Sequence, residues 1–533
     1  MDRRQFMITA SRLGLGGSAI ASIPGISSSS NRPLFFAEKS DGPRTAAQGP
    51  LRVLTVNPRY FTDGSGKAIY LAGCHTWWDF EDSGLRLLSA RDQDPPPVFD
   101  FNGYLDFLVA HDHNFFRLWR WEAPKWGEDQ PRGAIKYCQP HPWVRSGPGL
   151  ARDGKPKFDL TRFNQEYFAR LRTRVKAAGE RGIYVSIMLF EGHELENFTA
   201  WPFHPFEGAN NINGIDPDPC LGCDEIAQDD LHLPAAAGED LEGLKTTHFG
   251  GAVYVGKGLA YNTLQQTPMG KRVLALQEAY LRQVMDTVHD LDNVLYEVCN
   301  EAGGYSTAWQ YHVINYVKEY ESAKGKQHPV GMTFQSIGGT NDDLYQSPAD
   351  WISPHPGNAG ENYLADPSSV YHGKVIVNDT DHLCGHTCGD AVWVWKSFCH
   401  GLNVLMMEDL SSSPVWQDSA RIAMGQTRRY AEKMDLAHMP PDDSLAETRY
   451  CLANPGKEYL VFQPGNKGEF TVNLRDAPAA FAVEWFNVSS GKTIAGNPVK
   501  GGGVRTFPTP FGGPAALYLK ATSGPAARYA VPG

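Results

Sequence analysis

The chain has 533 residues, more than one ordinary domain of about 250–300 residues, so we expect one large domain and a smaller one. A composition of 41% hydrophobic and 11% aromatic residues excludes a disordered or fibrous protein. The formal net charge of −11, with no long basic run beyond the first residues, argues against a nucleic-acid ligand, because binding phosphates requires clustered Lys and Arg.

The first residues carry a pair of arginines. The sequence Asp2-Arg3-Arg4-Gln5-Phe6-Met7 precedes a mildly apolar stretch at 8–26, a pattern that resembles a twin-arginine export signal. The alternative is a chance arginine pair before a flexible tail. Glycines and Pro24 interrupt the stretch, so it lacks the roughly 20 apolar residues of a membrane span. We expect residues 1–49 to be an export signal and disordered linker, and the mature chain to be periplasmic or extracellular without a membrane span.

Eight short apolar or β-branched runs follow, at 69–74, 114–119, 184–190, 293–298, 329–334, 351–353, 374–378 and 402–407. Segments with helical periodicity, such as 163–181 and 271–289, lie between several of them. Alternating strands and helices imply parallel strands with right-handed crossovers. The sequence therefore predicts an α/β fold, a (β/α)8 TIM barrel over residues 50–440 that begins with a β-hairpin at 52–69.

Two other regions have a different character. Residues 191–268 contain many Gly, Pro, Asn and Asp and are expected to form a long loop after the third strand. Beyond residue 441, runs at 445–452, 458–463, 468–474, 482–487 and 515–519 alternate apolar and polar residues between turn formers. We expect an antiparallel β-sandwich domain at 441–533.

Nine cysteines are too few for a disulfide scaffold in a chain of this length. Two close pairs, Cys220 with Cys223 and Cys384 with Cys388, lie in Gly-rich segments. Each pair can form a local disulfide or remain as thiols, and with His382 and His386 the cysteines could bind zinc. The tandem spacing of a zinc site is absent, so we favour disulfides and expect no metal and no other cofactor.

The sharpest motif ends the fourth predicted strand, where residues 293–301 read Asn-Val-Leu-Tyr-Glu-Val-Cys-Asn-Glu. Catalytic residues of a barrel collect at the carboxyl ends of its strands. This strand resembles the fourth strand of clan A glycoside hydrolases. The resemblance implies that Glu301 is the general acid/base and that Asn300 binds the sugar 2-hydroxyl. The alternative is an Asn-Glu pair that only caps the following helix.

The same resemblance implies a second carboxylate at the end of the seventh strand. The family has Glu there, whereas residues 378–382 read Asn-Asp-Thr-Asp-His, so the shorter aspartate must approach the sugar more closely. We favour Asp379 over Asp381, with Glu408 or Asp409 at the end of the eighth strand as further alternatives. Retaining enzymes hold the two carboxyl groups about 5–5.5 Å apart and inverting ones about 6.5–9.5 Å.

Further residues near strand ends are expected to bind substrate. Asn114-Phe-Phe-Arg117 resembles the second-strand Asn-x-x-Arg of the clan, which implies that Arg117 steadies the ionised nucleophile. A buried arginine paired with any nearby carboxylate is the alternative. Because saccharide clefts are often lined by aromatic and polar side chains, we assign substrate contacts to His75, Trp77, Trp78, Trp119, His193, His355, Asn378 and Glu408. The acidic segment 191–196 lacks zinc-helix spacing and is read as substrate contacts or a solvated loop.

The hairpin at 57–67 together with the C-terminal β-domain resembles the apiosidase-like barrel hydrolases with a collagen-binding-type sandwich. This resemblance implies a substrate among plant or algal polysaccharide side chains. We predict an exported glycoside hydrolase that cleaves a polysaccharide or oligosaccharide by a two-carboxylate, retaining mechanism. The alternatives are a non-catalytic carbohydrate-binding protein on a decayed barrel and a metal-dependent hydrolase that uses the His and Cys loops. The sequence makes no prediction of oligomeric state.

Overall fold

The structure is a computed structural model of the chain. It describes residues 45–83, 93–127, 135–196, 200–217, 258–261, 263–264, 267–336, 338–357, 361–385, 388–408, 410, 415–466, 468–477 and 479–522. The arginine pair, Cys220, Cys223, His386 and Asp409 lie outside these residues. Among the described helices, none combines the length and apolar character needed to cross a membrane.

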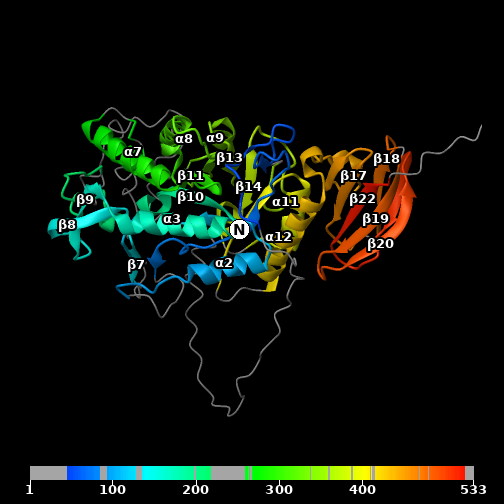
Figure 1. Ribbon diagram of the computed structural model, residues 1–533, viewed down its shortest axis with the longest axis horizontal. Helices are drawn as coiled ribbons and strands as arrows, with labels where there is room; N and C mark the ends of the chain where they lie inside the picture. The colour runs from blue at the N-terminus through cyan, green and yellow to red at the C-terminus, as the bar shows by residue number, and fades with distance from the viewer. Residues whose placement is uncertain are drawn as a thin grey trace, which may run out of the picture. The chain divides into compact units, whose positions relative to one another are not determined.

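Eight parallel strands form the central barrel (Figure 1). They are β3 (Ala72–His75), β5 (Phe115–Leu118), β10 (Tyr184–Glu191), β11 (Val294–Asn300), β12 (Val330–Thr333), β13 (Trp351–Ser353), β14 (Val375–Asp379) and β15 (Asn403–Met407). The order is β3-β15-β14-β13-β12-β11-β10-β5, and Asn114 N donates to Ala72 O at 3.0 Å where β5 meets β3. Gly73 permits this approach, since a Cβ there would lie 1.9 Å from Phe115 O. The predicted barrel is confirmed.

Helices alternate with these strands and pack around them (Figure 1). The longer ones are α2 (Phe101–Ala110), α3 (Gln165–Gly179), α7 (Pro268–Val288), α8 (Thr307–Ser322), α9 (Asn341–Gln346), α11 (Ala391–Cys399) and α12 (Val415–Lys433). The predicted helices at 163–181 and 271–289 correspond to α3 and α7. Asn164 and Thr267 begin them, each accepting a hydrogen bond from a backbone N–H of the first turn.

Additional strands lie between β3 and α3. They are β4 (Asp82–Ser83), β6 (Lys125–Gly127), β7 (Ile135–Gln139), β8 (Trp143–Leu150) and β9 (Pro156–Phe163). β4, β7 and β6 form one antiparallel sheet, and β8 pairs with β9 in a hairpin. The sequence did not predict this insertion. Within the predicted loop 191–268, the described residues include α4 (Gly192–Glu196), η2 (Trp201–Phe203) and η5 (Gly258–Tyr261).

The C-terminal strands form two antiparallel sheets around an apolar core. One sheet contains β16 (Cys451–Asn454), β17 (Glu458–Gln463), β22 (Ala515–Ala521), β19 (Ala480–Asn487) and β20 (Thr493–Lys500), and the other pairs β18 (Glu469–Leu474) with β21 (Gly503–Pro508). The predicted sandwich is confirmed. The expected strand at 445–452 begins only at Cys451, because Asp443–Leu445 form a 3-10 turn (η9). The sequence did not predict β20, because its residues are mostly exposed and do not alternate between apolar and polar.

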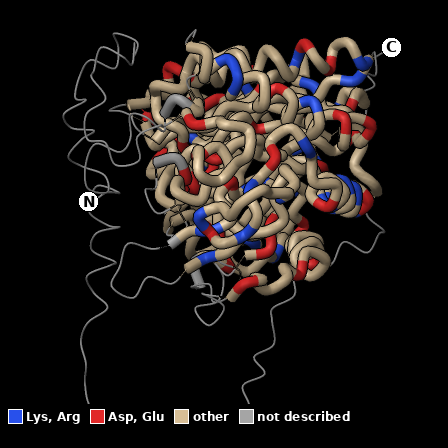
Figure 2. The backbone as a smooth tube through the Cα atoms, turned by 90° about the vertical axis from the view of Figure 1, so that its left-hand side faces the viewer, with Lys and Arg blue, Asp and Glu red and all other residues tan. Residues whose placement is uncertain are grey.

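Near the N-terminal side, β1 (Arg52–Val53) pairs with β2 (Phe61–Thr62) in the expected hairpin before β3. The remaining short helical elements are η6 (Gly304–Ser306), α10 (Thr380–Leu383) and η8 (Leu436–His438). Lys and Arg are interspersed with Asp and Glu over the face drawn in Figure 2.

Candidate active site

Arg117 is the centre of a buried network at the carboxyl ends of three barrel strands. Two guanidinium nitrogens donate to the carboxylate of Glu297 in β11. Nε lies 2.7 Å from Oε2, and Nη2 donates to Oε1. Nη2 also donates to Asn300 Oδ1 at 2.8 Å, and Nη1 donates to Asp381 Oδ2 at 2.7 Å. Burial opposes the charged form, but Glu297 and Asp381 raise the pKa of Arg117, so its positive charge is retained. Arg117 therefore pairs with two nearby carboxylates, those of Glu297 and Asp381, as well as with Asn300.

Glu301 follows β11 and leaves the strand in a left-handed backbone conformation, with φ of +44°. Its carbonyl oxygen accepts a 2.6 Å hydrogen bond from Ser336 Oγ, which helps to hold this conformation. Positive φ is uncommon for Glu and is concentrated at functional sites. The Glu301 carboxyl is 14% exposed, and its Oε2 lies 3.7 Å from His193 Nδ1. Helix α8 has Ser306 as its N-cap, so the interpretation of Asn300-Glu301 as a helix cap is wrong.

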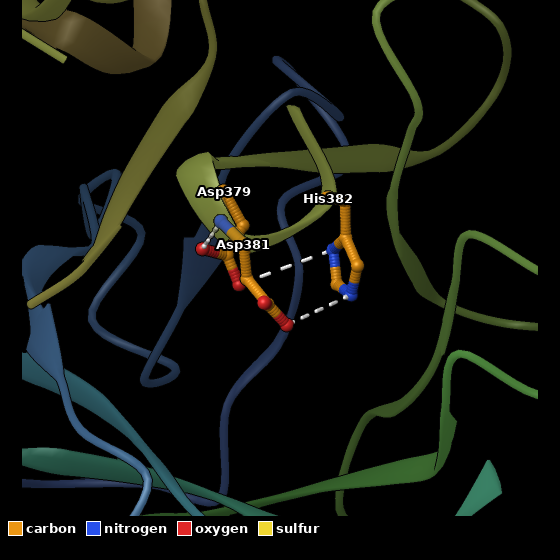
Figure 3. A group of neighbouring side chains, drawn as sticks. All are labelled: Asp379, Asp381 and His382. Carbon is orange, nitrogen blue, oxygen red and sulfur yellow. Dashed lines mark hydrogen bonds and ion pairs between the residues drawn. The ribbon is translucent and has the colours of Figure 1, made fainter. Parts of the chain in front are cut away.

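At the end of β14 lie Asp379, Asp381 and His382 (Figure 3). Asp379 caps α10, because its Oδ1 accepts the backbone N–H of Asp381 at 3.0 Å. The same oxygen lies 3.3 Å from His75 Nε2. Burial would raise the pKa of Asp379, but the imidazoles of His75 and His382 outweigh it and lower that pKa. Asp381 Oδ2 lies 3.6 Å from His382 Nε2, in addition to its bond with Arg117.

Asp379, Asp381 and His382 can each place one ligand atom within 4.8 Å of the others, a spacing compatible with a divalent cation. Arg117 already supplies a fixed positive charge 2.7 Å from Asp381 Oδ2 and would repel such an ion. His382 Nδ1 is also engaged, at 2.7 Å from Ser353 Oγ. We therefore interpret the group as part of the Arg117 ion-pair network.

Two further predicted residues join this network. His75 is fully buried, and its ring stacks on Trp119 with centroids 5.9 Å apart and an angle of 9°. The Arg117 guanidinium lies over the Trp119 ring at 4.8 Å. Trp77 and Trp78 follow β3 and pack edge to face on each other, with ring centroids 6.1 Å apart. Trp78 is 3% exposed.

Other predicted residues are directed elsewhere. Asn378 donates to Tyr363 O and to Ser397 Oγ of α11, both at 3.0 Å, so it faces the helix layer and the expected substrate contact is corrected. The reason is strand alternation, which places Asn378 and Asp379 on opposite faces of β14. Glu408 binds Arg421 of α12, with Nε at 2.8 Å, so its carboxylate is directed to the helix layer and we remove it as a second-carboxylate candidate.

His355 also differs from the expectation in its contacts. Its backbone N–H and carbonyl both bond the side chain of Asn341. Its ring packs on Phe334 with centroids 4.2 Å apart. These contacts of His355 run to Phe334, just after β12, and to Asn341 of α9.

Sequence reasoning did not predict that Glu191 and Glu122 are buried and linked to each other and to Asn300. Glu191 is fully buried, and its Oε1 accepts from Asn300 Nδ2 at 2.8 Å, so the solvated-loop alternative is wrong. Burial, with Glu194 adding to it, raises the pKa of Glu191. Glu122 accepts the Glu191 N–H at 2.8 Å; burial opposes its charged form, but Arg120 and His204 lower its pKa to about 2. A charged residue inside an apolar strand, as with Glu297 in β11, was the available signal, since such a group needs a partner.

Cys384 and Cys388 form a disulfide shortly after α10. The thiol and zinc alternatives for this pair are therefore wrong. The other described cysteines, Cys74, Cys138, Cys299, Cys399 and Cys451, are buried and form no disulfide.

Known structures share this architecture. A solved structure named "Glycoside hydrolase" matches with a TM-score of 0.51 and 12% identity, over 90% of this chain and all of its own. A glycoside hydrolase family 5 protein from Bacteroides vulgatus ATCC 8482 matches with a TM-score of 0.51 and 13% identity, over 89% of this chain and 94% of its own. The chain has the barrel fold of these glycoside hydrolases.

Comparison with family models matches only a short part of the chain. Residues 134–221 match a family model described as a domain of unknown function, DUF6298. The matched segment contains β7 to β10, α3, α4 and η2, which includes most of the inserted strands. A comparison with curated proteins finds no match.

Proposed function

We propose that this protein is a glycoside hydrolase that cleaves O-glycosidic bonds, with Glu301 as general acid/base and Asp381 as the second carboxylate. The observation that carries the proposal is the convergence of β5, β11 and β14 on one guanidinium, which bonds both Asn300, the neighbour of Glu301, and Asp381. The fold shared with solved glycoside hydrolases supports it.

The two carboxyl groups have the different surroundings that their roles require. Glu301 is partly exposed beside an imidazole and can exchange protons with substrate and water. Asp381 is buried, and its Oδ2 lies 2.7 Å from Nη1 of the Arg117 guanidinium, which holds the carboxylate in place by a charge-assisted hydrogen bond. We therefore prefer Asp381 to Asp379 as the nucleophile. Asp379 Oδ2 lies 3.9 Å from Arg117 Nη1, compared with 2.7 Å for Asp381 Oδ2, and Asp379 Oδ1 caps α10.

Glu301 would protonate the leaving glycosidic oxygen while Asp381 attacks the anomeric carbon, and Glu301 would then deprotonate the water that releases the sugar. This is the retaining course. The likeness to apiosidase-like hydrolases favours a side chain of a plant or algal polysaccharide as substrate. NMR of the first-formed anomer tests the course, and an inverted product would contradict it.

The central experiment compares Glu301→Gln with Asp381→Asn on polysaccharides and on aryl glycosides with good leaving groups. Removing the acid should lower kcat by roughly 10²- to 10⁴-fold on natural linkages, and less on aryl glycosides, which need little protonation. Asp381→Asn should abolish turnover of both. A matched control is Glu278→Gln, which removes a carboxylate 3.0 Å from His312 on the helix layer. Full turnover by Glu301→Gln would overturn the proposal.

A second candidate is a carbohydrate-binding protein without catalysis, favoured by the aspartates that stand where the family has Glu. It predicts glycan binding without release of reducing ends, in the wild type as well as in Glu301→Gln. Release of reducing ends by the wild type alone would exclude it.

We also propose export of the chain. The arginine pair Arg3-Arg4 and the disulfide between Cys384 and Cys388, a bond typical of oxidising compartments, support this location. Replacing both arginines with Lys should retain a reporter fusion in the cytoplasm, whereas continued export would contradict the twin-arginine route.

A further inference from the structure

The turn after β10 lies directly against the segment that carries Glu301, because β10 and β11 are neighbouring strands (Figure 1). Glu191, the last residue of β10, is paired in register with Asn300, the last residue of β11. Gly192 follows, and a Cβ at this position would lie 2.5 Å from the backbone nitrogen and Cα of Ala302. A larger residue would force the two chains apart. The turn therefore contacts the residues on both sides of Glu301.

The carboxyl group of Glu191 accepts hydrogen bonds from three N–H groups. Oε1 accepts from Asn300 Nδ2 at 2.8 Å and from the His193 backbone at 3.2 Å. Oε2 accepts from the Glu194 backbone at 2.7 Å. The side chain of Glu191 is fully buried, so water cannot take the place of these bonds. Three separate donors therefore fix the carboxyl group in one orientation.

The side-chain amide of Asn300 is held between two partners. Arg117 Nη2 can only donate, so the Asn300 atom 2.8 Å from it is the oxygen Oδ1. Nδ2 therefore faces Glu191, whose oxygen accepts. Without that acceptor the amide would lose one of its two anchors. Because Asn300 immediately precedes Glu301, with its left-handed backbone, a movement of Asn300 would also move Glu301.

His193 is the second link between Glu191 and Glu301. Its backbone N–H donates to Glu191 Oε1, and its Nδ1 lies 3.7 Å from Glu301 Oε2. One buried oxygen thus holds the residue before Glu301 and the residue whose imidazole lies beside the Glu301 carboxyl group. We propose that this turn positions Glu301 for proton transfer to the leaving oxygen and that Glu191 is its positioning residue, an inference that rests on the hydrolytic function proposed above.

The experiment compares kcat/KM for dinitrophenyl and phenyl glycosides of glucose, galactose, mannose, xylose and arabinose. Phenol needs a proton to leave, whereas dinitrophenolate leaves without one, so a misplaced Glu301 should affect mainly the phenyl glycosides. Glu191→Leu has a similar volume and removes both acceptor oxygens. We expect it to lower kcat/KM by about 10- to 100-fold for phenyl glycosides and by less than about threefold for dinitrophenyl glycosides.

Two further variants separate positioning from a structural role, because Glu191 also accepts two N–H groups of α4. Glu191→Gln keeps one oxygen, which can still accept from Asn300, and should recover most of the rate on phenyl glycosides. Glu321→Leu is the matched control, since it removes an equally buried glutamate from α8, where Oε1 lies 2.9 Å from Tyr296 OH. It should leave the ratio of the two rates unchanged, whatever it does to stability.

Gly192→Ala tests the same contact with the carboxyl group intact and replaces Glu191→Leu if that variant does not fold. Its Cβ would push Ala302 away, so it should show the same selective loss on phenyl glycosides. In the Glu301→Gln background, Glu191→Leu should lower the phenyl rate by less than about twofold further, because the group that it positions is already gone.

Equal losses on the two kinds of glycoside, or no loss, in Glu191→Leu or in the substitute Gly192→Ala would overturn the proposal. A loss in Glu191→Gln as large as in Glu191→Leu would also overturn it, as would a full further loss in the Glu301→Gln background. A wild type that hydrolyses neither polysaccharides nor aryl glycosides would remove the proposed function and the positioning role together. Hydrolysis that depends on Glu301 but not on Glu191 would remove the positioning role alone.

Discussion

The ends of β11 and β14 hold their acidic residues in opposite ways. At β14, Asp381 is 3% exposed, contacts the guanidinium of Arg117 and is followed by the disulfide of Cys384 and Cys388. At β11, Glu301 is partly exposed, has a left-handed backbone and lies beside His193. A nucleophile is well held by a buried cation, whereas a general acid/base needs access to water. This difference is the basis of the roles proposed for Asp381 and Glu301.

The largest effect should come from Arg117→Ala, which removes the cation on the β14 side and leaves Glu297 buried without its partner. We expect a loss of about 3–5 kcal/mol of unfolding free energy, measured by urea denaturation. Arg172→Ala is the control, since Arg172 forms an exposed pair with Asp290 at 2.7 Å and such pairs contribute about 0.2–1 kcal/mol. Equal losses in the two variants would contradict a buried ionic centre.

The next largest effect should be a loss of stability at acid pH that comes from Glu122. This residue supports the β11 side by accepting the Glu191 N–H. Its folded pKa of about 2 lies below its ordinary 4.5, so its stabilisation is present above about pH 4.5 and is lost as pH falls toward 2. The shift corresponds to about 3 kcal/mol. Glu122→Gln should lower stability at pH 6 and flatten the acid limb of the stability profile. A variant with an unchanged acid limb would refute this role, and the exposed Glu432→Gln serves as control.

Removing the disulfide should have a smaller effect, confined to the β14 side. Cys384 and Cys388 are four positions apart, and closure of so short a loop restricts the unfolded chain by about 2 kcal/mol. We expect the Cys384→Ser, Cys388→Ser double variant to melt at lower temperature than wild type. A reductant should lower the Tm of the wild type to that of the variant and leave the variant unchanged. A wild type insensitive to reductant would contradict this contribution.

The smallest effect tests the β11 side. Ser336→Ala removes the 2.6 Å hydrogen bond to Glu301 O and should cost about 1 kcal/mol of stability. Because that bond helps to hold the positive φ of Glu301, kcat should also fall, though less than in Glu301→Gln. Ser322→Ala removes an equivalent bond to Glu319 O on exposed α8 and should leave kcat unchanged. Unchanged kcat in Ser336→Ala would show that Glu301 keeps its conformation unaided.

The sequence predicted that Arg117, Asn300 and Asp381 lie near the ends of neighbouring strands, and the structure brings all three together in the Arg117 network. It did not predict their contacts, since it favoured Asp379 over Asp381 and expected Asn300 to bind the sugar. Roles that depend on a distant partner were not predicted either. Glu408 accepts a hydrogen bond from Arg421 of α12, and Asn378 donates one to Ser397 of α11. Neither partner could be inferred from local pattern, because strand ends expose residues of both faces.

The sequence by itself determined the barrel, since eight buried apolar runs separated by helical periodicity have few other ways to cover their surfaces. It also determined which strand ends carry acids. Only the tertiary structure decided that Arg117 bonds Asp381 more closely than Asp379, that Glu191 and Glu122 are buried, and that the inserted strands line a cavity. Strand pattern is a local signal of burial, whereas the choice among neighbouring charges depends on distances of a few ångströms between segments far apart in the chain.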